Sequence, residues 1–329
     1  MVSAEEAMSV TLTDILRREI PAWRERAMRA EPMSGGMTNR NFRVWVDDHP
    51  YFVRWGSEQA EILGIDRENE YRANLIAATL QVAPAVETYL AGRRIFVIQH
   101  VAGRALEPAD LATDDGVVQV ARMLRRIHQA GRVARKFSVF EVVRSYVEFL
   151  RRSRTVPAAV ASALRTADRM EAVVRDRLDC LCHNDLLAAN FLRSPDQRLW
   201  LVDWEYAGMG MGLFDLANFS ANQELSARLE ERLIAAYYGE LHGGRLAGLR
   251  LLRVMSDLRE ALWGYVQTQI SSIAFDFEAY GERFLTRVAS AMSSAQFAAD
   301  WETARRDPGG DSGLLAEDHV NQRTGDGPE

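Results

Sequence analysis

The spacing of apolar residues changes once along this chain, and this change limits the possible folds more than any other feature. In the first hundred residues, apolar and polar residues alternate in two hairpin-like stretches, 33–55 and 85–101, with a helix predicted between them over 65–80 and another before them at about 11–28. From about residue 107 the spacing predicts amphipathic helices at 114–130, 139–153, 223–241, 245–274 and 276–299. The chain therefore divides into a strand-rich beginning and a mainly helical remainder.

A strand-like segment interrupts the helical part at residues 178–208 and carries the most distinctive polar residues. His183, Asp185 and Asn190 have the spacing H-x-D-L-x-x-x-N, which forms the catalytic loop in protein kinases. There the aspartate accepts the proton of the attacking hydroxyl group and the asparagine holds a metal ion. The same residue types also form ordinary turns, so the motif alone leaves both interpretations open. His183 is predicted to hold the loop in place rather than to transfer a proton.

A second carboxylate follows the next apolar run of this segment. Phosphoryl transfer requires a carboxylate that holds Mg²⁺ against the nucleotide phosphates, beside the asparagine. Asp203 ends the run LWLV and is the candidate. Alone it would be explained as a cap at a strand end, but together with residues 183–190 it favours a site for ATP and Mg²⁺.

Such a site also needs a cation near the phosphates, and this chain has a single lysine, Lys136, far from the hairpins in sequence. Arg54 follows the first hairpin turn, and Glu70 on the next helix is its natural ion-pair partner. The alternative is that Arg54 is an ordinary outward strand residue. In the turn SGGMTN, Gly35 and Gly36 allow backbone amides to approach phosphate oxygens, although such pairs are common in turns.

Six blocks in order over residues 33 to about 290 carry a family resemblance: SGGMTNRNFRV, VRW, IDRENE, CHNDLLAANFL, LVDWEYAGMGMGLFDLANF and REALWGYVQ. They resemble the choline/ethanolamine kinases, in the bacterial choline kinase-like branch of the aminoglycoside phosphotransferase-like superfamily. The resemblance implies an α+β, protein-kinase-like fold of two lobes. A small antiparallel sheet with a helix would form the N-lobe over 1–101, and a mainly helical C-lobe would cover 102–304.

The resemblance also implies roles for individual residues. Asp185 would be the catalytic base, Asn190 and Asp203 the Mg²⁺ ligands, and Arg54, paired with Glu70, the cation at the phosphates. ATP would further contact Ser34, Gly35, Gly36, Thr38 and Asn39 in the turn and Gln99, His100 and Val101 at the hinge between the lobes.

The acceptor pocket is expected to hold an ammonium group, which aromatic faces and carboxylates bind. The resemblance places Glu205, Tyr206, Trp263 and Tyr280 there with Asp185, although helix-core packing alone would explain Trp263 and Tyr280. Animal choline kinases carry a tryptophan where this chain has Glu260, and a carboxylate suits a less substituted amine. The expected acceptor is choline or a related amino alcohol. The alternatives are ethanolamine, thiamine or an aminoglycoside as acceptor, or a non-catalytic nucleotide-binding pseudokinase.

The composition and charge of the chain limit its expected binding partners and its expected cellular compartment. The net charge is −6 with both signs interleaved, which argues against nucleic acid. The start of the chain is acidic, unlike a signal peptide, and no apolar run reaches the roughly 18 residues of a membrane-spanning helix. Cys180 and Cys182 are predicted to be buried thiols in a reducing compartment. We therefore expect a cytoplasmic enzyme, with a disordered tail over 305–329 rich in glycine, aspartate and proline.

Overall fold

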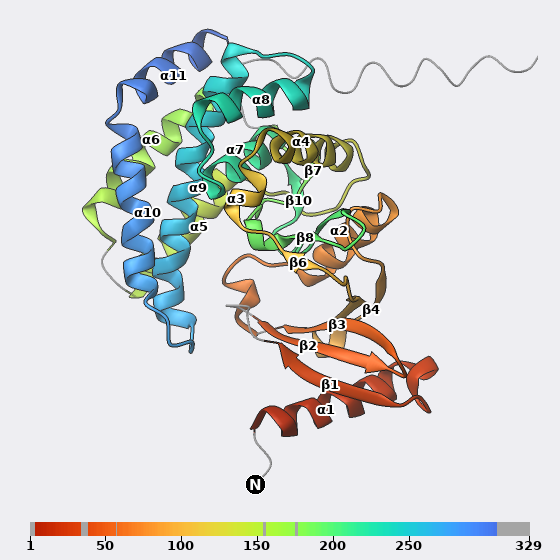
Figure 1. The fold of residues 1–329 in the computed structure, drawn as a ribbon. Coiled ribbons are helices and arrows are strands. Elements are labelled where there is room, and N and C mark those ends of the chain that lie inside the picture. Colours follow the sequence, from red (N-terminus) through yellow and green to blue (C-terminus); the bar gives the residue numbers. More distant parts are fainter. Residues whose placement is uncertain (1–3, 34–38, 57, 154–155, 175–176, 308–329) are drawn as a thin grey trace, which may run out of the picture.

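The computed structural model describes residues 4–33, 39–56, 58–153, 156–174 and 177–307. A small lobe with an antiparallel sheet lies below a large helical lobe (Figure 1). The sheet has the order β1-β2-β3-β5-β4. Its strands are β1 (Met28–Met33), β2 (Asn39–Val46), β3 (His49–Gly56), β4 (Val86–Leu90) and β5 (Ile95–Gln99). The two predicted hairpins are present, and Asp47 and Asp48 form the turn between β2 and β3.

The helix predicted at about 11–28 is wrong in its bounds. Helix α1 spans Ala4–Glu19, a short 3-10 turn covers Pro21–Trp23, and β1 starts at Met28. Pro21 explains the early end, because the residue before a proline is driven to extended geometry and Ile20 has φ −111°. Strand β1 escaped prediction because it lies at the sheet edge, where half of its residues are exposed and apolar alternation is weak.

The first lobe has a core of its own between α1 and the sheet. Leu12 and Leu16 of α1 pack on Phe42, Val53 and neighbouring strand residues. Helix α2 (Arg67–Thr79) belongs instead to the larger core, through Ala73 and Ala77. Helix α2 therefore connects the small lobe to the core of the helical lobe, and the predicted division into 1–101 and 102–304 stays a prediction.

Helix α2 begins where the sequence predicts, and Asp66 caps it. The Asp66 carboxylate accepts a hydrogen bond from the backbone N–H of Asn69 at 3.0 Å. We expect Asp66→Ala to lower the free energy of unfolding by about 0.5–2 kcal/mol, because the first turn loses this acceptor. Urea unfolding, with Asp48→Ala in the exposed β2–β3 turn as control, measures the effect. Equal losses in the two variants would contradict the capping role.

The large lobe is built around the long helix α9 (Gly243–Ile270), which packs against α5, α7, α10 and α11. The other helices are α3 (Pro108–Leu111), α4 (Asp114–His128), α5 (Val139–Ser153), α6 (Ala158–Val174), α7 (Gly212–Asn222), α8 (Ala227–Tyr238), α10 (Phe277–Met292) and α11 (Ala295–Arg306). Helices α6 and α7 were not predicted. The helix predicted at 276–299 is two helices, since Ser294 caps the start of α11. Residues 305 and 306 of the predicted tail are helical, and the tail from residue 308 lies outside the described residues.

The strand-like segment forms two small sheets rather than one pair of strands. Strand β7 (Cys180–Cys182) pairs with β10 (Gly208–Gly210), and β8 (Phe191–Arg193) pairs with β9 (Leu199–Leu201) and β6 (Arg104–Ala105). The backbone N–H of Val202 donates to the carbonyl of Asn190 at 2.9 Å. The loop after β7 and the residues after β9 therefore lie side by side.

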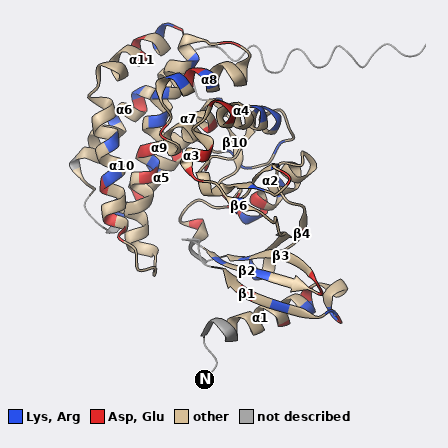
Figure 2. Cartoon of the chain, in the orientation of Figure 1, with Lys and Arg blue, Asp and Glu red and all other residues tan. Residues whose placement is uncertain are grey.

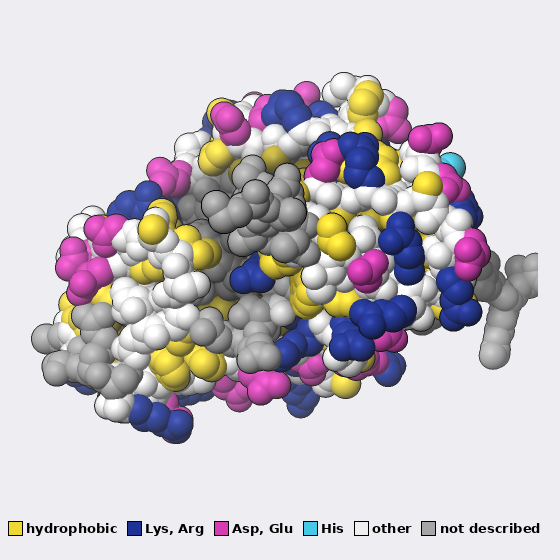
Figure 3. All heavy atoms as spheres, turned by 90° about the horizontal axis from the view of Figure 1, so that it is seen from below, with side chains coloured by type: hydrophobic (Ala, Val, Ile, Leu, Met, Phe, Trp, Pro, Cys, Tyr) yellow, Lys and Arg dark blue, Asp and Glu magenta, His cyan; other side chains and the backbone are white. Residues whose placement is uncertain are grey.

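Charged residues of both signs are mixed over the surface. Basic and acidic positions alternate along the helices of the large lobe (Figure 2). On the face seen from below, Lys and Arg side chains lie among Asp and Glu side chains (Figure 3). Among the described residues, no helix combines the length and apolar character that crossing a membrane requires.

Candidate active site

Hydrogen bonds of His183, Asp185 and Asn190 hold the loop that follows β7. His183 is fully buried, and its Nε2 lies 3.0 Å from the carbonyl of Val202 while the N–H of Asp185 donates to its Nδ1 at 3.3 Å. The side-chain amide of Asn190 donates to the carbonyl of Asp185 at 2.8 Å. Burial also lowers the pKa of His183, so the imidazole is neutral. This geometry matches the holding role predicted for His183.

Helix α7 supports this loop through residues to which the sequence assigned no role. The two carboxylate oxygens of Asp215 accept the backbone N–H groups of His183 and Asn184 at 2.8 and 2.7 Å. Asn218 accepts the N–H of Leu186 at 2.6 Å. The available signal was the pair of polar residues in the apolar run GLFDLANF, because polar side chains inside a buried helix need partners.

Asp185 lies in a buried group of charges. The guanidinium of Arg259, on α9, contacts the Asp185 carboxylate at 2.7 Å, the carboxylate of Glu260 at 3.0 Å and the carbonyl of Asn184. Asp185, Arg259 and Glu260 are each more than nine-tenths buried. Burial raises the pKa of Asp185 to about 7, although Arg259 opposes the rise. The candidate base is thus held at a pKa near neutrality, which suits proton abstraction.

Asn190 and Asp203 offer the oxygen ligands that Mg²⁺ requires. The Asn190 amide nitrogen is engaged with the loop, which directs its oxygen away from that bond. Asp203 has φ +66°, a left-handed geometry that aspartate tolerates better than most residues, and its side chain is 39% exposed. The chemistry of this pair fits a hard cation beside Asp185.

Arg54 joins the two lobes. Its guanidinium pairs with Glu70 of α2, as the sequence predicts, and with Asp203 of the large lobe. Arg67 extends the network and contacts Glu70 at 2.7 Å and Glu205 at 3.2 Å. A cation beside the candidate metal ligand is placed to contact phosphate oxygens.

The other predicted nucleotide contacts are only partly described. Ser34, Gly35, Gly36 and Thr38 lie outside the described residues. Asn39 starts β2, where its amide donates to Glu205 at 3.0 Å and its oxygen accepts from Arg67 at 2.6 Å. Gln99, His100 and Val101 follow directly along β5 into the connection between the lobes. Their contacts with adenine stay a prediction.

Trp263 and Tyr280 come together because two helices approach closely. A side chain at Gly281 of α10 would lie 2.9 Å from the backbone carbonyl of Ala261 of α9, so the absence of a side chain there allows the close approach. The rings of Trp263 and Tyr280 lie 5.7 Å apart, and the Tyr280 hydroxyl donates to Glu260 at 3.0 Å. Phe275 and Phe277 complete an aromatic group next to the Arg259–Glu260 pair.

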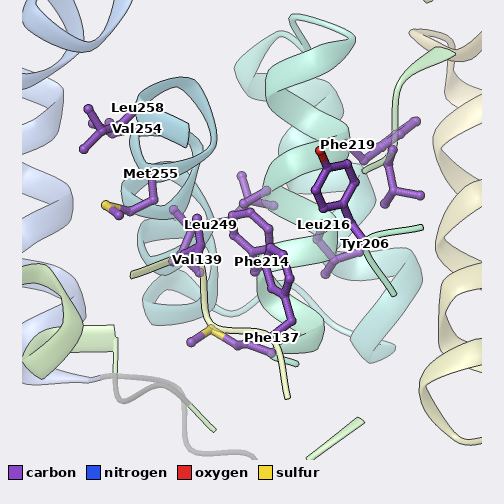
Figure 4. Packing of buried hydrophobic residues seen from close by; sticks show 14 of the residues in the cluster. Phe137, Val139, Tyr206, Phe214, Leu216, Phe219, Leu249, Val254, Met255 and Leu258 are labelled. Carbon is purple, nitrogen blue, oxygen red and sulfur yellow. The ribbon is translucent and has the colours of Figure 1, made fainter. Parts of the chain in front are cut away.

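Tyr206 and Glu205, two residues predicted for the acceptor pocket, are held by different surroundings. Tyr206 is buried among core side chains around α7, with Leu216 and Phe219 (Figure 4), and its ring lies 5.0 Å from the Arg259 guanidinium. This packing favours a supporting role behind Arg259. The Glu205 carboxylate faces the small lobe, where Asn39 and Arg67 hold it, and burial raises its pKa. Contact of either residue with the acceptor stays a prediction.

A small sheet-containing lobe beside a large helical lobe, with the candidate base and candidate metal ligands near their boundary, is the arrangement of kinase-like phosphotransferases. The chain belongs to the phosphotransferase enzyme family, which it matches over residues 29–249. Ethanolamine kinase 2 of Mus musculus is 25% identical to it over 81% of this chain and 77% of the mouse protein.

Solved structures agree with this assignment. A choline/ethanolamine kinase family protein from Mesorhizobium loti has a TM-score of 0.76 and 26% identity, over 91% of this chain and 100% of that one. LicA in complex with AMP has a TM-score of 0.72 and 22% identity, over 89% and 99% of the two chains. The α+β two-lobe fold and the resemblance to choline/ethanolamine kinases are therefore confirmed, and the protein is a phosphotransferase.

Proposed function

We propose that this protein is an ATP-dependent kinase that transfers the γ-phosphoryl group to the hydroxyl of choline or a related amino alcohol. The buried Asp185–Arg259–Glu260 group beside the aromatic side chains carries the proposal, because it combines a base with a binding site for an ammonium group. Asp185 orients the acceptor hydroxyl and accepts its proton. Arg54 contacts the phosphate oxygens.

Asn190 and Asp203 would hold Mg²⁺, which supplies positive charge to offset the charge that develops on the phosphoryl oxygens. The hydrogen bonds of His183 and Asp215 keep the base and the metal ligands at a fixed separation. Pre-organised groups of this kind cost no rearrangement during the reaction. The AMP bound to LicA supports an adenine nucleotide as the donor.

The charges of the pocket support an acceptor with one positive charge. Two carboxylates, of Asp185 and Glu260, share the single guanidinium of Arg259, which leaves one net negative charge when both are ionised. A monocation balances that charge, and the faces of Trp263 and Tyr280 bind an ammonium group by cation–π attraction. An aminoglycoside carries several charges and would call for more carboxylates. Glu260 also accepts a hydrogen bond from a less substituted amine, which favours ethanolamine-type acceptors beside choline.

An acceptor screen tests the proposal. Purified protein with ATP and Mg²⁺ is assayed for ADP release against choline, ethanolamine, their methylated intermediates, thiamine and kanamycin. We expect stimulation by amino alcohols with a single ammonium group. No stimulation by any of them would remove the proposal. The proposal places the enzyme in the cytoplasm, which supplies ATP and keeps Cys180 and Cys182 reduced.

Trp263→Ala should raise the KM for the amino alcohol roughly tenfold or more and leave the KM for ATP nearly unchanged, because a desolvated cation–π contact contributes about 2 kcal/mol. Steady-state kinetics for both substrates measure this split. Trp263→Phe keeps an aromatic face, so its KM for the amino alcohol should lie between the values of Trp263→Ala and the wild type. Trp45→Ala, on a half-buried tryptophan of β2, is the control. Equal changes in both KM values would mean that the ammonium site is elsewhere.

A further inference from the structure

The two cysteines of the chain lie side by side beneath the catalytic loop. Cys180 and Cys182 are on the same face of β7, and their sulfur atoms are 3.8 Å apart. Cys182 is fully buried, whereas Cys180 is partly exposed and gives solvent a route to the pair. The phosphotransfer reaction proposed above uses neither thiol.

Two further side chains that commonly bind metals converge on Cys182, the buried member of this pair. His128 comes from α4 and Asp215 from α7, and one ligand atom of each lies within 4.8 Å of the Cys182 sulfur and of the other. All three of these residues are buried. The His128 Nε2 lies 3.0 Å from the Asp215 carboxylate, and its Nδ1 lies 2.6 Å from the Tyr237 hydroxyl.

The spacing of the sulfur atoms matches that of a metal dithiolate. Two thiolates on tetrahedral zinc, each at about 2.3 Å, lie roughly 3.8 Å from each other. Cys180 and Cys182 already have this separation. We propose that Cys180, Cys182 and His128 form a binding site for a thiophilic divalent cation of the Zn²⁺ class, with Asp215 as the nearest oxygen ligand.

The proposed site is distinct in chemistry from the one at Asn190 and Asp203. Sulfur and imidazole ligands select soft or borderline cations, whereas Mg²⁺ prefers oxygen ligands. Binding converts the two thiols to thiolates and releases two protons to the solvent, while the cation takes their place. His128 exchanges one of its present hydrogen bonds for the cation.

Occupation of this site would act on the loop through Asp215. The Asp215 carboxylate holds the backbone N–H groups of His183 and Asn184 and also contacts His128. A cation bound to His128 competes for this carboxylate and loosens its hold on the loop. We therefore infer that such cations inhibit the enzyme without competing with either substrate.

A titration of the full chain with Cd²⁺ as a spectroscopic substitute for Zn²⁺ tests the site. The chain has two cysteines, so the ultraviolet thiolate-to-cadmium charge-transfer band reports on this pair alone. In the presence of a non-thiol reductant we expect one cation per chain, a band of two-thiolate intensity and release of two protons. A chelator competition then measures the affinity for Zn²⁺.

Variants make the test specific. Cys180→Ser should halve the band and weaken binding at least tenfold while leaving basal activity and the fold unchanged, and His128→Gln should weaken binding with the band retained. Asp203→Asn, which alters the proposed Mg²⁺ site, should bind Cd²⁺ as the wild type does. No band at micromolar cation, or the same band and affinity in Cys180→Ser, would overturn the proposal. These readouts do not depend on catalysis, so they stand apart from the proposed function.

Discussion

Asp185→Asn is expected to reduce kcat by about 10²- to 10⁴-fold, the usual contribution of a general base. Asparagine keeps the shape of the side chain and its contact with Arg259, but its amide cannot accept the proton of the acceptor hydroxyl. The KM for ATP should change little, because no phosphate contact is proposed for Asp185. Single-turnover kinetics at saturating ATP and acceptor measure the loss.

Asp257→Asn is the matched control for this variant. Asp257 is another buried carboxylate of α9, and it pairs with Arg287 at 3.0 Å. Its ion pair is with Arg287 and not with Arg259, so its substitution should leave kcat within a few fold of the wild type. A residual kcat above one tenth in Asp185→Asn would mean that another group takes the proton.

Arg259→Met is expected to have the largest effect on stability, about 3–5 kcal/mol of unfolding free energy, because it leaves two buried carboxylates without a counterion. Asp185 and Glu260 both pair with this guanidinium. Urea unfolding measures the loss. Arg287→Met, whose guanidinium is more exposed, is the control and should cost less. If Arg259→Met lowers the unfolding free energy no more than Arg287→Met does, then water or protonation of the two carboxylates compensates for the lost guanidinium.

The same variant makes a kinetic prediction with a definite sign. Arg259 lowers the pKa of Asp185, so its removal should raise that pKa above the value of about 7 in the intact group. The ionised Asp185 carboxylate, which is the form that accepts the proton, would then be populated only at higher pH. We expect kcat/KM of Arg259→Met to keep rising at pH values where the wild type has levelled off, and Arg259→Lys to restore part of the wild-type profile. Identical profiles would contradict an electrostatic role for Arg259.

The parts of the site that sequence reasoning located are those with a local signature. Asp185 and Asn190 belong to one loop, so their spacing is visible along the chain. The pairing of Arg54 with Glu70 could be inferred because a strand and the helix that follows it bring the two residues together. Helix α2 was found for the same reason, since Asp66 caps it within one turn.

The parts that sequence reasoning missed depend on contacts across long separations. Arg259 lies 74 residues from the carboxylate with which it pairs. Asp215 lies 32 and 31 residues from the two backbone N–H groups that donate to it. No periodic pattern encodes such a pairing. The edge strand β1 was also missed, because weak alternation at an exposed edge carries little signal. The early end of α1 was missed although Pro21 is a local signal for it.

By itself, the sequence determined the division into a strand-rich and a helical part, and it supplied the loop motif at 183–190 and the candidate cation Arg54. These follow from periodicity, fixed spacing and the single lysine, all of which are properties of the chain as written. Only the tertiary structure decided that Arg259 pairs with both Asp185 and Glu260, that the Tyr206 ring packs near Arg259, and that His128 lies close to Cys182. Such arrangements arise when helices pack, because burial forces distant polar groups to satisfy one another.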